Sequence, residues 1–225
     1  MSGLDVALQG KAFAGRAVLG PIAFRLAPGE RACLLGPSGI GKSTLLSLIA
    51  GLDDDYDGRI DPGAGRLAMV FQAPRLLPWR TLARNIALVP GAGGMDRARA
   101  LLARAGLAEA ADHYPEKVSL GMQRRAALCR ALAVDPGLIL LDEPLVSLDP
   151  RAADQMRALL RDSLDQTGAA ALLTTHDRRE ALSLCDRILE IDGSPARLVR
   201  DRPSPLSRRD RLDPDRVEAA LRAMF

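Results

Sequence analysis

One segment of the chain has the residue types and spacing of a phosphate-binding loop. Residues 36–43 read GPSGIGKS, which matches GxxxxGK followed by Ser or Thr, between a strand-length apolar run and a helical pattern. Glycines let backbone N–H groups turn toward phosphate oxygens, and the positive end of the following helix attracts the same anion. In such a loop Lys42 reaches the β and γ phosphates, and the Ser43 hydroxyl binds Mg²⁺. The predicted binding residues are Gly36, Pro37, Ser38, Gly39, Ile40, Gly41, Lys42, Ser43 and Thr44.

A second candidate for chemistry is a pair of acids behind a short apolar run. Residues 138–141 read LILL, and Asp142 and Glu143 follow directly. A parallel strand delivers the residues after it to the sheet edge where α/β proteins bind ligands. There Asp142 can hold Mg²⁺ through water, and Glu143 is placed to polarise an attacking water. A plain acidic turn is the alternative, and the phosphate-binding loop argues against it.

The segments around these residues predict the elements that position them. The 225 residues suffice for one α/β domain, and 48% of them are hydrophobic, which is typical of a globular chain. Apolar runs predict strands at residues 4–9, 22–26, 31–35, 67–71, 137–141, 169–174 and 187–191, and residues 53–65 are predicted to be a loop with room for one edge strand. Helical patterns cover residues 95–105, 121–133, 151–164 and 178–184, and another follows the loop until Gly51.

The domain organisation follows from these patterns. We predict an α/β fold with a P-loop NTPase core: a mixed, mainly parallel sheet, a small antiparallel β subdomain and an inserted helical subdomain. The core domain spans residues 1–193, with the helical insertion at about 73–136. Residues after Gly193 are rich in Pro, Arg and Ser and are predicted to form a linker. Asp213 and Pro214 then begin a final helix to Phe225, as N-cap and first helical residue.

Composition excludes several other classes of function. The net charge is +3 and aromatic residues make up 3%, without the basic stripe and stacking aromatics of a nucleic-acid site. Cys33, Cys129 and Cys185 form no CxxC pair and are predicted to be buried free thiols of a reducing compartment. The N-terminal residues lack the pattern of a signal peptide, and no apolar run is long enough to cross a bilayer. We expect an intracellular chain that reaches a membrane only through a partner.

Taken together, these motifs resemble the ATP-binding cassette family of transport ATPases over roughly residues 4–193. The resemblance implies ATP and Mg²⁺. It implies that Gln72 is the Q-loop glutamine, which touches Mg²⁺ and senses the γ-phosphate, and that His176 is the H-loop contact to that phosphate. Asp149 matches the D-loop, which faces the opposite subunit. Phe13 is the candidate for stacking on adenine. Each has a simpler alternative: Gln72 as a surface amide, His176 as a structural histidine, Asp149 as an N-cap and Phe13 as a core aromatic.

The signature segment departs from the family pattern LSGGQ. Residues 118–122 read VSLGM, so Ser119 and Gly121 are kept, while Leu120 replaces a glycine and Met122 replaces the glutamine. In the family this serine hydroxyl and glycine N–H cap the γ-phosphate held by the facing subunit. We expect a backbone that tolerates a side chain at Leu120, with that side chain directed away from the phosphate. We expect closure on ATP that is reduced but real, and a degenerate, non-hydrolysing site is the competing interpretation.

The resemblance also implies an assembly. Two copies form a head-to-tail homodimer and bind an integral membrane permease, and a solute-binding protein completes the system. The chain would then lie in the cytoplasm, on the inner face of the cell membrane. Residues 73–81 read APRLLPWRT and resemble the segment that receives a permease helix in nitrate, sulfonate and taurine importers, with Trp79 as an anchor. An ordinary turn with a buried Trp is the alternative.

Three other functions stay open at this stage. An exporter subunit would use the same motifs. A non-transport cassette ATPase acting on DNA or ribosomes usually carries a coiled-coil insertion or a second cassette, and neither is present in this sequence. A small-molecule kinase would not need Ser119, Gly121 or His176. The final helix is predicted to serve packing or dimer contact, with regulation as the alternative.

Overall fold

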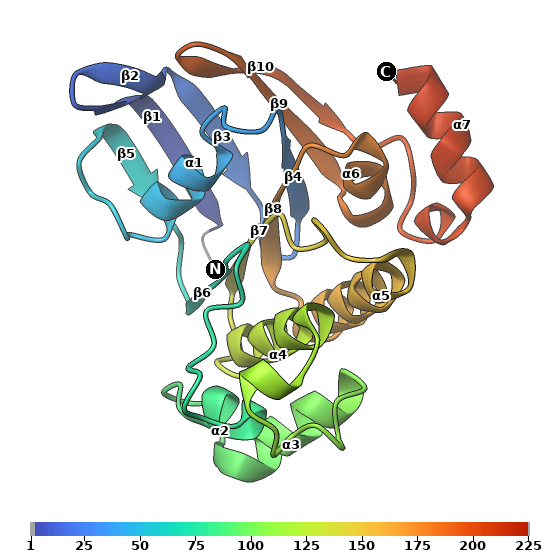
Figure 1. The fold of residues 1–225 in the computed structure, drawn as a ribbon. Coiled ribbons are helices and arrows are strands. Elements are labelled where there is room, and N and C mark those ends of the chain that lie inside the picture. Colours follow the sequence, from blue (N-terminus) through green and yellow to red (C-terminus); the bar gives the residue numbers. More distant parts are fainter. Residues whose placement is uncertain (1–2, 225) are drawn as a thin grey trace. The chain divides into compact units, whose positions relative to one another are not determined.

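The computed structural model describes residues 3–224, which divide into two compact units (Figure 1). The strand-rich unit consists of residues 3–64 and 170–224, and the helical unit of residues 65–169. The helical unit begins before and ends after the helical subdomain predicted at about 73–136, because it includes a strand pair as well as helices.

The strand-rich unit is built on a mixed sheet in the order β3-β1-β2-β10-β9-β4-β8. Its strands are β1 (Leu4–Phe13), β2 (Arg16–Leu19), β3 (Ile22–Leu26), β4 (Arg31–Leu35), β8 (Ala170–Thr175), β9 (Arg187–Gly193) and β10 (Ala196–Pro203). The strands β4, β8 and β9 pair in parallel. Every residue of β4 and β8 is buried, as expected of continuous apolar strands covered on both faces.

The antiparallel part of this unit centres on β1, which pairs with β2, β3 and β5 (Asp57–Asp61). Alternate residues Leu4, Val6 and Leu8 are buried, so β1 has the two-residue period of a half-buried strand. The predicted edge strand is β5. Strand β2 was not predicted, because its four residues are too few and too exposed to show a period.

Helices of the strand-rich unit follow its parallel strands. Helix α1 (Lys42–Ile49) begins after β4, and α6 (Arg178–Leu184) begins after β8. The predicted final helix is α7 (Pro214–Met224), which packs beside α6 (Figure 1). Phe225, its predicted last residue, lies outside the described residues.

The predicted linker after Gly193 is wrong for residues 196–203. These residues form β10, which pairs antiparallel with β9 from Ala196 to Pro203. The sequence hides this strand because only Ala196 is buried, Leu198 and Val199 are its only other apolar residues, and the remaining positions carry Arg, Asp and Pro. Arg187 on β9 forms an ion pair with Asp201 on β10, with 2.6 Å between the Arg187 Nη2 and the carboxylate.

The segment between β10 and α7 is held to the strand-rich unit by Asp186. Its carboxylate accepts hydrogen bonds from Arg208 (2.8 Å) and from the buried Arg211 (2.8 Å). Burial of the carboxyl opposes ionisation, but these bonds outweigh it and lower the pKa of Asp186 to about 2. Residues 204–213 are therefore fixed by charge pairing rather than by an apolar face.

The helical unit contains one parallel strand pair and most of the long helices. Strands β6 (Leu67–Val70) and β7 (Leu138–Asp142) pair in register from Leu67 with Leu138 to Val70 with Leu141. Its helices are α2 (Leu82–Ala87), α3 (Gly94–Arg104), α4 (Leu120–Leu132) and α5 (Pro150–Thr167), with a 3-10 turn at Pro115–Lys117. The short α2 was not predicted.

Two further predictions concern the cysteines and the possibility of a membrane-spanning helix. Cys33, Cys129 and Cys185 are buried and free, as predicted. None of the helices within residues 3–224 is long and apolar enough to cross a membrane.

Candidate functional site

The predicted phosphate-binding loop joins β4 to α1, and its backbone requires glycine. Gly39 has φ +76° and Gly41 has φ +113°, which are conformations that residues with a side chain rarely adopt. A Cβ on Gly36 would lie 2.8 Å from the Ile191 carbonyl oxygen. The loop can therefore run close to the sheet and expose backbone N–H groups at its turn.

Lys42 closes this loop. Its side chain is buried, at 4% exposure, and its Nζ donates to the carbonyl oxygens of Gly36 and Pro37, each at 2.9 Å. Gly41 precedes α1 in the left-handed conformation and gives the helix no side-chain cap. An ammonium group and the N-terminus of a helix thus meet at one turn, which is the arrangement that binds phosphate.

His176 lies beside the same loop. It follows β8, whose Thr175 carbonyl accepts the N–H of Gly36 at 3.4 Å, and it precedes α6. Thr175 Oγ1 donates to Glu180 Oε2 at 2.7 Å and accepts from the Asp177 N–H at 3.0 Å, so the turn that carries His176 is fixed. The histidine itself is exposed.

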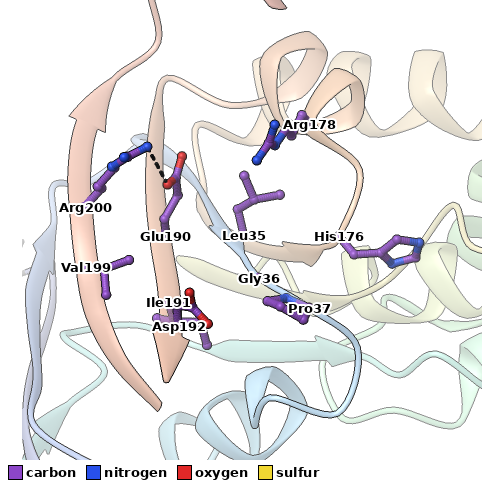
Figure 2. Close-up of a pocket in the computed structure, with 10 residues that line it drawn as sticks. All are labelled: Leu35, Gly36, Pro37, His176, Arg178, Glu190, Ile191, Asp192, Val199 and Arg200. Carbon is purple, nitrogen blue, oxygen red and sulfur yellow. Dashed lines mark hydrogen bonds and ion pairs between the residues drawn. The ribbon is translucent and has the colours of Figure 1, made fainter. Parts of the chain in front are cut away.

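A cavity of about 570 Å³ lies between the loop and the strands β9 and β10 (Figure 2). Gly36, Pro37 and His176 line one side of it. Figure 2 shows Glu190 and its ion-pair partner Arg200 on the opposite side, and Arg178 near the start of α6. A second hollow of about 470 Å³ separates the loop residues Ser38, Gly39 and Ile40 from β2.

Phe13 ends β1 on the hairpin to β2 and is 48% exposed. The interpretation of Phe13 as a simple core residue is therefore wrong. The strand-rich unit thus brings together the phosphate-binding loop, the predicted γ-phosphate contact and the hairpin with the candidate base-stacking ring.

The helical unit places three of the predicted residues at one sheet edge. Asp142 is the last residue of β7 and is 6% exposed, and Glu143 follows it. Gln72 is exposed two residues after the end of β6, the parallel neighbour of β7. Glu143 has φ +43°, a strained backbone for a non-glycine residue that is common at functional sites.

The signature segment forms the start of α4. Ser119 is the N-cap, and its Oγ accepts from the Met122 N–H at 3.3 Å. Leu120 is the first helical residue, has no positive φ and is 45% exposed. The backbone is therefore one that any residue adopts, and glycine is not needed at position 120.

Asp149 is an N-cap, as its alternative interpretation proposed. Its carboxylate accepts from the Ala152 N–H at 2.9 Å at the start of α5. A Cβ on Gly121 would lie 3.3 Å from the Ala152 Cβ, so the starts of α4 and α5 are close neighbours. Capping leaves Asp149 exposed and does not exclude a contact with a facing subunit.

Sequence reasoning missed two buried cations near these residues. Arg124 on α4 is 7% exposed and donates to the Val146 carbonyl, which ties α4 to the turn after Glu143. Lys11 on β1 is 4% exposed and lies over the Phe13 ring. An Arg within the apolar part of α4 is a weak signal in the sequence, and Lys11 gives none.

Comparison with known proteins decides the family. The family model described as ABC transporter matches residues 19–146. Proteins named aliphatic sulfonates import ATP-binding protein SsuB are similar over nearly the whole chain. The relative from Burkholderia cenocepacia is 41% identical, over 94% of this chain and 82% of its own length. The relative from Pseudomonas aeruginosa UCBPP-PA14 is also 41% identical, over 94% of this chain and 91% of its own.

The chain belongs to the ABC transporter family. A solved structure has the same fold: the dimeric structure of a post-hydrolysis state of the ATP-binding cassette MJ0796 bound to ADP and Pi. It matches with a TM-score of 0.77 and 26% identity, over 91% of this chain and 100% of its own. The predictions of a P-loop NTPase fold and of an ATP-hydrolysing transport subunit are confirmed. Because these relatives are named as import proteins, the exporter and non-transport alternatives are not favoured.

The residues of this ABC ATPase fit the Mg²⁺ that accompanies ATP. The predicted donors are the Ser43 hydroxyl, the Gln72 amide and the Asp142 carboxylate, and such oxygen atoms suit Mg²⁺. Asp142 is buried as the last residue of β7, so its carboxylate is placed at the end of a parallel strand. When bound, Mg²⁺ would neutralise part of the charge on the β and γ phosphates.

Proposed function

We propose that this chain is the ATPase subunit of an importer for aliphatic sulfonates or a closely similar organic anion. The observation that carries the proposal is the 41% identity, over 94% of the chain, to several proteins named for aliphatic sulfonate import. Two copies would form a head-to-tail homodimer on the cytoplasmic face of a membrane permease, and a solute-binding protein would deliver the solute. A dimeric neighbour structure supports the homodimer.

In the proposed site the strand-rich unit binds the nucleotide. Lys42 and the backbone of residues 36–44 hold the phosphates, and Phe13 stacks on adenine. His176 contacts the γ-phosphate from the fixed turn after β8. The support is local geometry: the left-handed glycines, the buried Lys42 and the short path from Thr175 to Gly36.

The proposed chemical and coupling residues belong to the helical unit. Glu143 accepts a proton from the attacking water, and Asp142 and Gln72 hold Mg²⁺ together with Ser43. Ser119 and Gly121 cap the γ-phosphate of the ATP bound by the facing subunit, next to Asp149. The strained backbone at Glu143 and the adjoining starts of α4 and α5 support these roles.

We propose that the turn before α2 docks the permease. Asn85 is 1% exposed, accepts from the Leu77 N–H at 2.7 Å, and donates to the carbonyls of Leu77 (3.1 Å) and Arg80 (3.0 Å). The turn is therefore rigid, yet it presents Trp79 at 69% exposure. The alternative of an ordinary turn with a buried Trp is wrong. A rigid turn with an exposed aromatic has the chemistry of a protein anchor.

Trp79→Ala should therefore separate assembly from ATP hydrolysis. We expect the purified variant to keep its ATPase activity, because Trp79 contributes little to the core, and to lose affinity for the permease by about 10- to 100-fold. The measurement is co-purification with the detergent-solubilised permease. Leu212→Ala is the control, since Leu212 is 61% exposed in the strand-rich unit. Unaltered assembly of the Trp79 variant would place the docking surface elsewhere.

The solute proposal is tested by transport. The wild-type chain, its permease and its binding protein are reconstituted in liposomes, and ATP is supplied on the side of the ATPase. We expect ATP-dependent movement of butanesulfonate toward the ATPase side, at least about 10-fold faster than that of nitrate. Faster movement of nitrate would overturn the sulfonate assignment, and movement away from the ATPase side would overturn import.

A further inference from the structure

The Phe13 ring has a cation on one face. Lys11 Nζ lies over the ring, 4.5 Å from its centroid. The Lys11 side chain is only 2% exposed, whereas Phe13 remains 48% exposed. A ring covered by a buried cation on one side and still half exposed has its other face open to a ligand.

Lys11 is held in this position by the loop between α1 and β5. Its Nζ forms an ion pair with Asp53 (2.9 Å) and donates to the Asp55 carbonyl (2.5 Å) and carboxylate (3.2 Å). Burial opposes the charge on Lys11, but the hydrogen bonds to these two acids outweigh it and raise its pKa. The ammonium therefore stays charged behind the ring at physiological pH.

The hairpin that carries Phe13 also borders the phosphate-binding loop. Phe13 pairs with Arg16 across the turn, and Arg16, Ala17 and Val18 line the hollow of about 470 Å³ whose other wall is Ser38, Gly39 and Ile40. A nucleotide with its phosphates on the loop therefore has space to place its sugar and base toward this hairpin.

We propose that Lys11 is a positioning residue for the adenine base, fixing the Phe13 ring from behind so that its open face is ready to stack. This inference rests on the proposed role of Phe13. A cation attracts the electron-rich face of an aromatic ring. The ring loses its freedom before the nucleotide arrives, so less entropy is lost on binding. A purely structural role for Lys11 would instead affect both ends of the nucleotide site.

The test compares two probes that differ in whether they carry a base. ATP and inorganic tripolyphosphate are titrated calorimetrically into the full chain, as wild type and as Lys11→Met, which keeps the apolar stem and removes the charge. We expect the Kd of ATP to rise about 3- to 10-fold and that of tripolyphosphate to stay unchanged. Lys11→Arg, which keeps a cation over the ring, should restore ATP affinity. Arg25→Met is the control, because Arg25 is an exposed ion-pair partner of Asp5 on the neighbouring strand.

Phe13→Ala separates failure of the inference from failure of the proposed function. If Phe13→Ala leaves ATP affinity unchanged, the stacking role is wrong and the Lys11 proposal falls with it. If Phe13→Ala weakens ATP binding and Lys11→Met does not, only the Lys11 proposal is overturned. The Lys11 proposal is also overturned if Lys11→Met weakens the binding of ATP and of tripolyphosphate equally. In a Phe13→Ala background, Lys11→Met should have no further effect on ATP affinity.

A second variant covers the case in which Lys11→Met does not fold. Lys11→Gln retains a hydrogen-bond donor toward Asp53 and Asp55, removes the charge and places the donor one bond closer to the backbone. Like Lys11→Met, it should weaken the binding of ATP and leave the binding of tripolyphosphate unchanged. An unchanged ATP affinity would contradict the proposal.

Discussion

Replacing Glu143 with glutamine should abolish most ATP turnover and leave ATP binding intact. Glutamine has the same shape and keeps a hydrogen bond to water, but it cannot accept a proton. General-base catalysis contributes about 10²- to 10⁴-fold, so steady-state hydrolysis should fall by at least about 10²-fold. Phosphate release measures turnover, and calorimetric titration measures binding. Full hydrolysis by the variant would remove Glu143 from its proposed role.

The same variant should accumulate as an ATP-bound dimer. If each ATP is held between two facing subunits, blocking hydrolysis blocks reopening. Size-exclusion chromatography with ATP and Mg²⁺ should then show a shift from monomer to dimer, and no shift without ATP. Glu109→Gln is the control, because Glu109 is an exposed glutamate of the same unit. A variant that binds ATP but stays monomeric would contradict closure by this chain alone.

This dimer assay also tests the unusual signature segment. Leu120 begins α4 in an ordinary helical backbone and is 45% exposed, while Ser119 caps the helix. The N-terminus of α4 is therefore intact despite the replacement of glycine by leucine, as the proposed contact with a facing nucleotide requires. We retain the prediction that closure is reduced rather than lost, and Leu120→Gly should strengthen the dimer if the added bulk is the cause.

Local patterns in the sequence predicted the parts of the fold that depend on neighbouring residues. The strand Arg31–Leu35 and the helix Arg178–Leu184 lie at the predicted residues, because a mainly apolar run and an amphipathic helix need no distant partner to be recognised. β10 was missed for the opposite reason. It is a largely polar and mostly exposed strand that forms because β9 offers it backbone partners, and that pairing is not visible in its own composition.

In the candidate site, too, some features follow from the local sequence and others depend on the tertiary fold. The spacing of the phosphate-binding loop predicted the position of Lys42, but the burial of Lys11 depends on irregularities in β1. The strand register shifts between Leu8 and Gly10 against β5 and between Lys11 and Ala12 against β2. Simple alternation after Leu8 would direct Lys11 to solvent, and the shift against β5, which leaves Gln9 as an extra residue in β1, breaks that alternation. Exposure of Phe13 and Trp79 likewise depends on the tertiary fold, because an isolated aromatic suits a core or a surface equally.

Lys42→Ala should abolish measurable ATP binding. In the proposed site the buried ammonium is the positive charge that the loop supplies to the phosphates, and charge-assisted hydrogen bonds of this kind contribute about 1.5–3 kcal/mol each. Loss of two such bonds predicts a decrease in ATP affinity of at least about 10²-fold. Lys117→Ala is the control, since Lys117 is 70% exposed in its side chain. Normal ATP affinity in the Lys42 variant would overturn the phosphate-binding assignment.

The probe without a base makes this result specific to one end of the nucleotide. Lys42→Ala should lose affinity for tripolyphosphate as completely as for ATP, because Lys42 is proposed to contact the phosphates alone. Phe13→Ala should lose affinity for ATP only. If the two variants show these opposite patterns, the loop and the hairpin bind separate parts of one ligand. If Lys42→Ala retained tripolyphosphate, the two carbonyl bonds of Lys42 would be its whole function and the loop backbone would carry the anion.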